Sequence, residues 1–530
     1  MMSMEREVLK NAAIYGVAGI LSKAIGFFML PFYAHMLGTH GYGVIGMFDS
    51  ACSLLLSIFG YGITGSVIRI YHEEEKQNKR CVVTTGVLLL MLVSAPVIGG
   101  LIIIREHLSS MLFGGPQYSW LALFGLAAFG VDLYGLTASQ SLIVNQRSVV
   151  FSIINLSRLI VAVPVYVFFV KRYGVEGYFL GTFLLAVIGS TAFNYFCFTG
   201  VGLKFDWLIA KQIVKFEGPL IPGHIFVFIS RQIERVFVRY MISLESVGIL
   251  EMGYKFAPLL NIFIFEPFML SWHTKRTEIA EQKNGKERIG KMFTSFLFLL
   301  IFGAIILIVT VKDIIELLTP PEFWMSYRIA KIEIITTVLS ACYYHAYFGL
   351  YFMRRTGYIS LIRIVTSSFK LLFSFYLIKA YGIMGAAYSA CAFMCIQVLW
   401  AFIAGQRSYT IRYEYKKIFL LICFGYIITY LLDDGVVGGN IKSQIQNWES
   451  PSNWVICLEG TLIGKMMSAK MIAVLTEKLS LVLVIIMKIS LCLPFLILGV
   501  AIKATETNGG WLGRGLMIVG MIKRVVLVRR

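Results

Sequence analysis

Apolar runs of roughly twenty residues recur along the chain, about fourteen of them, and each is long enough to cross the hydrocarbon core of a bilayer as one helix. Of the 530 residues, 58% are hydrophobic and only 15% are charged, and the mean hydropathy is +0.77. This composition excludes a soluble globular protein. The fold class expected is therefore an all-α polytopic membrane protein.

Hydropathy and loop charge together place the helices. The first run follows a mixed-charge stub and has no small-residue cleavage site, so we expect a retained helix and not a removed signal peptide. The expected helices cover residues 14–37, 44–68, 82–104, 118–144, 149–170, 176–198, 219–243, 247–271, 293–311, 326–353, 358–379, 383–404, 416–432 and 479–502.

The net charge of +19 is unevenly distributed between the loops. Basic residues gather in alternate short loops, as in the segment from Lys275 to Lys291, and the intervening loops hold few of them. This pattern is typical of cytoplasmic loops in multi-pass membrane proteins. We therefore expect a cytoplasmic N-terminus and no nucleic-acid partner.

A repeat relates the two halves of the chain. "KRYGVEGYFLG" from Lys171 aligns with "KAYGIMGAAYS" from Lys379 at an offset of 208 residues (379 − 171). The same offset aligns Ser22 with Ser230 and Arg147 with Arg355. Two six-helix bundles with the same orientation in the membrane, a parallel repeat, are typical of transporters with a substrate path between the halves. The expected domains are 1–200, 201–410 and a C-terminal addition at 411–530.

No catalytic or cofactor motif is convincing. "GYGVIG" from Gly41 has the letters of a dinucleotide-binding loop but no preceding strand, and "GTLIGKM" near Lys465 is too short for a phosphate-binding loop. The nine cysteines include no CxxC pair and no histidine at ligand spacing. We therefore expect no enzyme activity, no cofactor and no metal site.

The apolar stretch "SRQIERVFVRYM" is exceptional because it contains Arg231, Glu234, Arg235 and Arg239. A basic side chain at the bilayer centre costs about 2.5–3.5 kcal/mol on insertion scales, so such residues normally face water, a ligand or an opposite charge. At helical spacing these four residues fall within an arc of about 140°. They therefore share one face, which points away from lipid. Arg239 lies near the helix end and is equally consistent with an interfacial anchor.

Other charges lie deep in expected helices of both halves, and most of them are basic. Structural neutralisation by an acid such as Glu266 is one interpretation, but basic residues would be left over. The second interpretation is a hydrated cationic cavity for an anion, in which arginine suits phosphate because its planar fork bonds two oxygens. The candidate anion-binding residues are Lys23, Arg158, Arg231, Arg235, Lys255, Arg363 and Lys370, and the candidates for ion coupling or pairing are Asp49, Asp132, Glu234 and Glu251.

Three stretches resemble the Wzx-type polysaccharide flippases of the multidrug/oligosaccharidyl-lipid/polysaccharide exporter superfamily. They are "YGVAGILSKAIGFFMLPFYAHMLGTHGYGVIGMFDS", "SRQIERVFVRYMISLESVGILEMGYKFAP" and "YGIMGAAYS". The resemblance covers about residues 8 to 430 and implies a fourteen-helix inner-membrane protein. It implies alternating-access transfer of undecaprenyl-diphosphate-linked oligosaccharide, with the diphosphate in the cationic cavity. Glu234 stands where aspartate is common, and Tyr254-Lys255 ends the pattern.

Two other functions are compatible with parts of this pattern. A multidrug or organic-cation antiporter of the same superfamily would need an acidic pocket, and a membrane-embedded polymerase or glycosyltransferase would carry a large external loop between the halves. A proton or sodium counter-ion, a polysaccharide polymerase and a chain-length regulator are the further partners considered. The polymer, whether O-antigen, capsule or exopolysaccharide, stays open. After Leu432 the sequence departs from the family pattern, so the topology of 433–530 also stays open.

Overall fold

A computed structural model describes residues 26–73, 79–145, 147–199, 204–218, 221–432, 478, 481–482 and 484–492. All regular structure in these ranges is helical, as expected. The chain forms two compact units, of which the first holds residues 1–252 and 364–389 and the second holds 253–363 and 390–530. The predicted sequence domains at 1–200, 201–410 and 411–530 stay a prediction.

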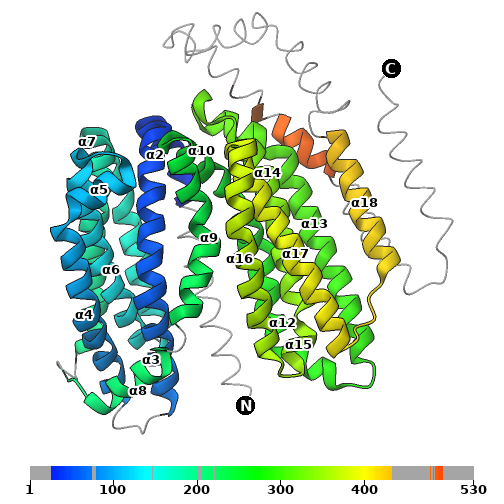
Figure 1. Ribbon diagram of the computed structural model, residues 1–530, viewed down its shortest axis with the longest axis horizontal. Helices are drawn as coiled ribbons and strands as arrows, with labels where there is room; N and C mark the ends of the chain where they lie inside the picture. The colour runs from blue at the N-terminus through cyan, green and yellow to red at the C-terminus, as the bar shows by residue number, and fades with distance from the viewer. Residues whose placement is uncertain are drawn as a thin grey trace, which may run out of the picture. The chain divides into compact units, whose positions relative to one another are not determined.

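The first unit contains the helices from α2 to α10 in the labels of Figure 1. Their bounds are α2 Leu30–Leu55, η1 Leu56–Gly60, α3 Tyr61–Glu73, α4 Lys79–Ile103, α5 Arg105–Phe113, η2 Pro116–Tyr118, α6 Ser119–Val144, α7 Ser148–Phe198, α8 Trp207–Glu217, α9 Ile221–Met241 and α10 Leu244–Tyr254. Helices α4, α6 and α7 lie side by side, and their apolar faces form the main core of this unit with α3 and α8.

The second unit begins at Gly253, within the last turn of α10. Its elements are α11 Pro258–Leu260, η4 Asn261–Phe265, α12 Glu266–Glu281, α13 Gly285–Leu318, η5 Pro321–Phe323, α14 Ser326–Ala346, α15 Phe348–Phe352 and α18 Tyr415–Leu432. Two more helices, α16 Thr356–Tyr381 and α17 Ile383–Ser408, contribute residues to both units. Lys255 lies in the turn between α10 and Pro258, a residue that cannot donate a backbone hydrogen bond.

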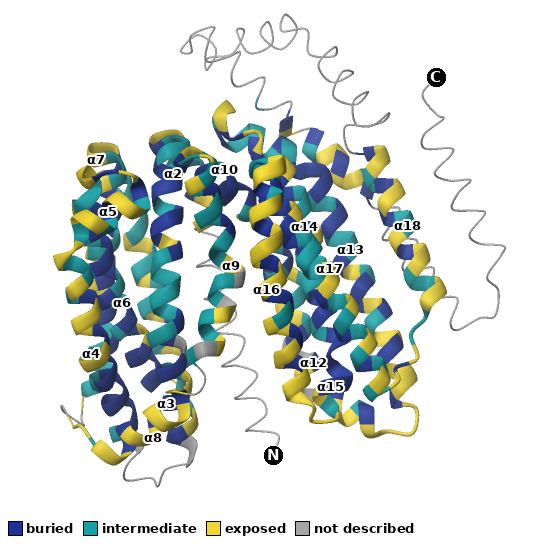
Figure 2. Cartoon of the chain, in the orientation of Figure 1, coloured by how far each residue is buried: buried dark blue, intermediate teal, exposed yellow. Residues whose placement is uncertain are grey.

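Nine stretches within the described ranges are long and apolar enough to cross a membrane. Large apolar side chains are exposed along several helices, as the yellow segments of α16 and α18 in Figure 2 show. On α18 the exposed fraction reaches 67% for Phe419 and 72% for Tyr426. A soluble surface would not carry such a stripe, whereas lipid solvates it. The expectation of a multi-pass membrane protein is therefore confirmed.

The aligned glycines of the predicted repeat have the same local geometry. Gly174 and Gly382 have φ of 57° and 59°, a left-handed conformation that favours glycine, and each separates two helical segments. Gly177 and Gly385 follow, and a Cβ on either would lie 2.0 Å from a backbone carbonyl oxygen of the preceding segment. This agreement is consistent with the predicted repeat.

The last described helical residues, 481–482 and 484–492, run antiparallel to α13. The Lys478 ammonium donates to the carbonyl oxygens of Glu316 and Leu317 at the end of α13, and Lys488 donates to that of Val309. Cys492 then joins an apolar cluster with residues of α13 and α18. Of the helix expected at 479–502, residues 481–482 and 484–492 are helical, and the rest lies outside the described residues.

Candidate functional site

Helix α9 carries the charged row that the sequence singles out. Its charges were expected on one face, and the structure gives them different surroundings. Glu234 is buried with 2% of its surface exposed, Arg235 and Arg239 are half-buried, and Arg231 is exposed. The row is therefore not a uniform cationic surface.

Glu234 is paired with a base from another helix. Its Oε1 lies 2.8 Å from the Lys370 ammonium on α16, and both side chains are less than a tenth exposed. The Ser389 hydroxyl of α17 donates to the same oxygen at 3.4 Å, and Ser374 donates to Ser389 at 3.0 Å. A buried charge needs such partners because desolvation is unfavourable. This cluster connects α9 to α16 and α17 inside the first unit.

Arg235 forms an ion pair with Glu251 of α10, through its Nε and the carboxylate Oε1. Its Nη1 also donates to the carbonyl oxygen of Arg231 at 3.0 Å. Gly46 of α2 makes room for the acid, since a Cβ there would lie 2.4 Å from the Glu251 Cγ. The pair is almost buried, with side-chain exposures of 14% and 11%. Arg235 is thus held between helices.

A third ion pair joins α6 to α7. Arg158 donates to Asp132 at 2.7 Å, with 28% and 37% of the two side chains exposed. Both residues interact electrostatically with Tyr166, whose ring contacts Tyr33 and Tyr178 at centroid distances of 5.7 and 5.3 Å. An aromatic cluster therefore borders this more accessible pair.

Asp49 is exposed on α2 and interacts electrostatically with Tyr166 and Tyr178 of the same aromatic cluster. The carboxylate is thereby associated with the region of the Asp132–Arg158 pair. Asp49 is one of the four acids predicted to couple an ion or to pair with a base, and each of the other three forms an ion pair with a basic residue.

Two predicted cations form no ion pair within the described residues. Arg231 is exposed on α9, and only its backbone carbonyl takes part in a hydrogen bond with another residue's side chain. Lys255 is exposed in the second unit. Arg363, also in that unit, donates to the Tyr343 hydroxyl at 3.3 Å. Lys23 lies outside the described residues.

Arg239 contacts protein and not an open cavity. Its Nε donates to the carbonyl oxygen of Leu112 at 3.1 Å, and the neighbouring Tyr240 hydroxyl donates to that of Met111 at 2.8 Å. These carbonyls belong to the last turn of α5, where a helix has unsatisfied acceptors and a partial negative charge. The geometry favours an anchoring role for Arg239.

Sequence reasoning missed a second kind of buried charge. Asp313 and Lys488 form a 2.6 Å ion pair with exposures of only 1% and 3%, yet the expected helix ended at residue 311. The available signal was the apolar pattern that continues through Ile314, Ile315 and Leu317. An acid inside a continuing apolar run requires a partner.

Glu217 at the end of α8 was also missed. It is 5% exposed, packs against Gly62 of α3 and lies 3.1 Å from the His224 Nε2. Burial raises the pKa of the Glu217 carboxyl, and His224 partly opposes this shift. Glu217 belongs to a short amphipathic helix outside the candidate membrane spans.

Glu217→Gln is expected to stabilise the protein at neutral pH. A raised folded-state pKa contributes stability below the unfolded-state pKa, and that contribution is lost as pH rises through the folded-state value. Glutamine mimics the protonated acid, so the gain in unfolding temperature should disappear below about pH 4. Thermal unfolding in detergent at both pH values tests this, with exposed Glu278→Gln as control. An equal gain at both pH values would contradict it.

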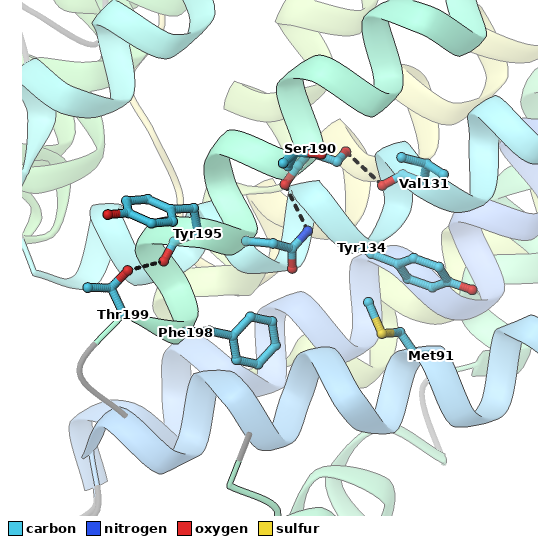
Figure 3. A pocket seen from close by; sticks show the side chains of 9 residues that line it. Met91, Val131, Tyr134, Ser190, Tyr195, Phe198 and Thr199 are labelled. Carbon is cyan, nitrogen blue, oxygen red and sulfur yellow. Dashed lines mark hydrogen bonds between the residues drawn. The ribbon is translucent and has the colours of Figure 1, made fainter. Parts of the chain in front are cut away.

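One cavity of about 650 Å³ lies in the first unit between α4, α6 and α7. Figure 3 shows Met91 and Phe198 on its walls, with Ser190 donating to the carbonyl oxygen of Val131 at 2.7 Å. Its nine described lining residues include no charged side chain and none of the predicted site residues. This cavity does not fit an anion site.

Comparison with protein families found one match. The family described as "Polysaccharide biosynthesis protein" matches residues 8–273, which is half of the chain. This segment includes α9 and both members of the Asp132–Arg158 and Arg235–Glu251 pairs. Of the third pair it includes Glu234 but not Lys370. A comparison with curated protein sequences found no match.

Solved structures with the same fold are transporters. The lipid II flippase MurJ in an inward closed conformation has a TM-score of 0.63 at 14% identity, over 92% of this chain and all of that one. An inward-facing multidrug resistance MATE transporter of the MOP superfamily has a TM-score of 0.59 at 13% identity, over 76% of this chain and 96% of that one. These likenesses establish the fold and confirm the expected class.

A third structure is a MOP superfamily transporter from Pyrococcus furiosus, whose description reports a binding pocket of reverse polarity suggesting a different function. Its TM-score is 0.50 at 13% identity, over 78% of this chain and 95% of that one. Pocket polarity therefore differs among proteins of this fold. It has to be argued from the residues of each chain.

Proposed function

Because the chain belongs to the polysaccharide biosynthesis protein family, we propose that it flips undecaprenyl-diphosphate-linked oligosaccharide repeat units across the bacterial cytoplasmic membrane by alternating access. The fold it shares with a lipid II flippase supports this proposal. Transfer across a bilayer breaks no covalent bond, so we propose no enzymatic step. The N-terminus is cytoplasmic in this proposal.

The exposed, unpaired position of Arg231 within the described residues is the observation that supports a diphosphate substrate. Three of the acids that could neutralise deep cations are already paired: Asp132 with Arg158, Glu234 with Lys370 and Glu251 with Arg235. Arg231 lies on α9 with Glu234 and Arg235, is exposed, and forms no ion pair in the described part of the chain. A guanidinium of this kind can bond two oxygens of a diphosphate. An organic-cation antiporter would instead need an excess of acids.

Arg231→Ala is expected to reduce transfer of repeat units by about tenfold or more. A charge-assisted hydrogen bond contributes about 1.5–3 kcal/mol, and 1.4 kcal/mol corresponds to a factor of ten. The amount of lipid-linked repeat unit exposed at the outer leaflet measures transfer, and immunoblotting checks that protein stays in the membrane. Arg172→Ala, an exposed arginine outside this site, is the charge-matched control. Normal transfer by Arg231→Ala would exclude the assigned contact.

A null strain tests the function itself. The flippase proposal expects completed lipid-linked repeat units to accumulate on the cytoplasmic side. Loss of polymer length with translocation intact would instead identify a polymerase, and the flippase proposal would fail. Chemical analysis of the accumulated lipid would also identify the sugar.

We also propose that a proton or sodium ion is exchanged during transport. Asp49, Asp132, Glu234 and Glu251 are the candidate carriers, and each protonation would release or weaken a neighbouring base where a pair exists. Ionophores that collapse the proton and sodium gradients should then slow transfer. Transfer that is insensitive to both ionophores would exclude coupling.

A further inference from the structure

Arg276 on α12 is a buried cation with unused hydrogen-bond donors. The residue is only 3% exposed, and its Nε and Nη1 have no hydrogen-bond partner among the described residues. The guanidinium lies over the rings of Tyr351 and Phe348, at 4.7 and 5.4 Å from their centroids. Buried polar groups normally have partners, so this arrangement requires an explanation.

Two other buried cations differ from Arg276 because each has a carboxylate partner. Lys370 and Lys488 are as deeply buried, and each lies within 2.8 Å of a carboxylate. Arg276 forms no ion pair within the described residues. Aromatic faces attract its charge, but they leave the in-plane N–H groups without acceptors. An acceptor in the plane of the guanidinium would satisfy these donors.

A second polar group in the same part of the unit is also unpartnered. His345 is 4% exposed, and its Nε2 has no hydrogen-bond partner among the described residues. Its ring stacks on Phe293 and Trp272, with centroids 4.5 and 5.8 Å away. Trp272 shares an apolar cluster with Phe348, over which Arg276 lies, and His345 interacts electrostatically with Arg276.

The surroundings favour an anion. Exposed Lys275, Lys283, Lys286 and Arg288 lie along the end of α12 and the start of α13, and Glu287 is paired with Lys291 at 3.0 Å. The acids Glu278 and Glu281 are exposed. Bases exceed acids here, so the local field concentrates anions. The fork of arginine matches two oxygens of a phosphate better than a monatomic anion.

We propose that Arg276 binds a phosphate group, carried either by a lipid head group or by inorganic phosphate. The site lies wholly within the second unit and includes none of the residues proposed to contact the transported diphosphate on α9. Trp272 makes the site observable because its ring shares the cluster. Occupancy should therefore change its fluorescence.

The experiment follows tryptophan fluorescence of the full-length protein in detergent. Three probes are titrated: inorganic phosphate, micelles containing phosphatidylglycerol, and micelles containing a phosphate-free diglucosyl lipid. Trp272→Phe identifies the part of the signal that reports the site. Arg276→Gln removes the fork, Arg276→Lys keeps the charge without the fork, and Arg288→Gln is a control for loss of one exposed charge.

A saturable Trp272-dependent change that weakens about tenfold or more in Arg276→Gln, and to a smaller extent in Arg276→Lys, supports the site. Response to inorganic phosphate assigns a free phosphate ligand, and response to phosphatidylglycerol alone assigns a lipid head group. An equal response to the phosphate-free lipid overturns the proposal. So does no response in wild type, or a response that Arg276→Lys leaves unchanged. The wild-type and lysine results decide the outcome even if Arg276→Gln fails to fold.

Discussion

Arg235→Ala is expected to destabilise the protein by about 3–5 kcal/mol, because it leaves the Glu251 carboxylate buried without its base. The acid cannot easily turn toward water, since it is 8% exposed and packs against Gly46 of α2. Its partner Arg235 reaches it from α9. The loss should appear as a lower free energy of unfolding and less folded protein in detergent.

Removing the stranded charge should reverse most of this loss. In Arg235→Ala/Glu251→Gln, the amide replaces the carboxylate at nearly the same volume and no buried charge is left. Denaturant titration in mixed micelles measures both variants. Arg231→Ala is a matched control because it removes the same group one turn earlier, where the residue is exposed and unpaired within the described residues. If Arg235→Ala is as stable as this control, the structural role is wrong.

The same pair of variants separates two roles of Arg235. Loss of transfer in the single variant alone would be ambiguous because the protein would also unfold. A stable double variant that does not transfer repeat units would show that this ion pair has a role in transport besides its role in stability, through Arg235 as a substrate contact or through Glu251 as an ion carrier. A stable double variant with normal transfer would restrict Arg235 to structure.

Much of the fold could be predicted because apolar length and loop charge act locally. The span expected at 118–144 is α6, and the break between 149–170 and 176–198 is the bend at Gly174. Short helices could not be predicted from apolar length. Helix α8 is only 11 residues long, too short to cross a membrane, and it packs three apolar side chains, Ile209, Ala210 and Ile213, into the core.

The sequence identified candidate residues for a site but could not identify their partners. The sequence predicted that the four charges of α9 share one face and that Glu234 is a candidate for ion coupling or pairing, but it did not identify the base. Lys370, on α16, is that base. Which carboxylate meets which cation depends on tertiary packing, and no local pattern contains that information. Arg231 was a candidate from the sequence, and the ion pairs distinguish it from Arg235 and Lys370, which have acidic partners.

The burial of Arg276 could not be predicted from the basic segment in which it lies. Sequence patterning groups Arg276 with Lys275 and Lys283 as one cytoplasmic cluster, because all three follow an apolar run. Helix α12 continues to Glu281, so the Arg276 side chain is buried over the Tyr351 ring while both lysines are exposed. Charge counting establishes the number of cations at this end of the helix but cannot distinguish the buried one.

Lys488→Met is expected to cost about 3–5 kcal/mol, because Asp313 on α13 would be left as an unpaired carboxylate with 1% of its side chain exposed. The 2.6 Å pair is the most enclosed of those described above, and Lys488 also donates to the carbonyl oxygen of Val309. The loss should therefore release the last helix from α13. Limited proteolysis after residue 478 and the free energy of unfolding in mixed micelles measure it.

A second change should restore the contact by another means. Asp313→Leu/Lys488→Met replaces the ion pair with apolar groups, which is often neutral or stabilising in a buried site. Lys312→Met is the matched control, since it is the same substitution beside Asp313 at a partly exposed lysine over the Tyr327 ring. Its cation–π contact contributes only about 0.5–1 kcal/mol. If Lys488→Met loses no more than Lys312→Met, or if the double variant is less stable than Lys488→Met, then the ion pair does not hold this helix. Stability recovered only in the double variant would show that neutralisation, and not the lysine stem, is what the last helix needs for docking.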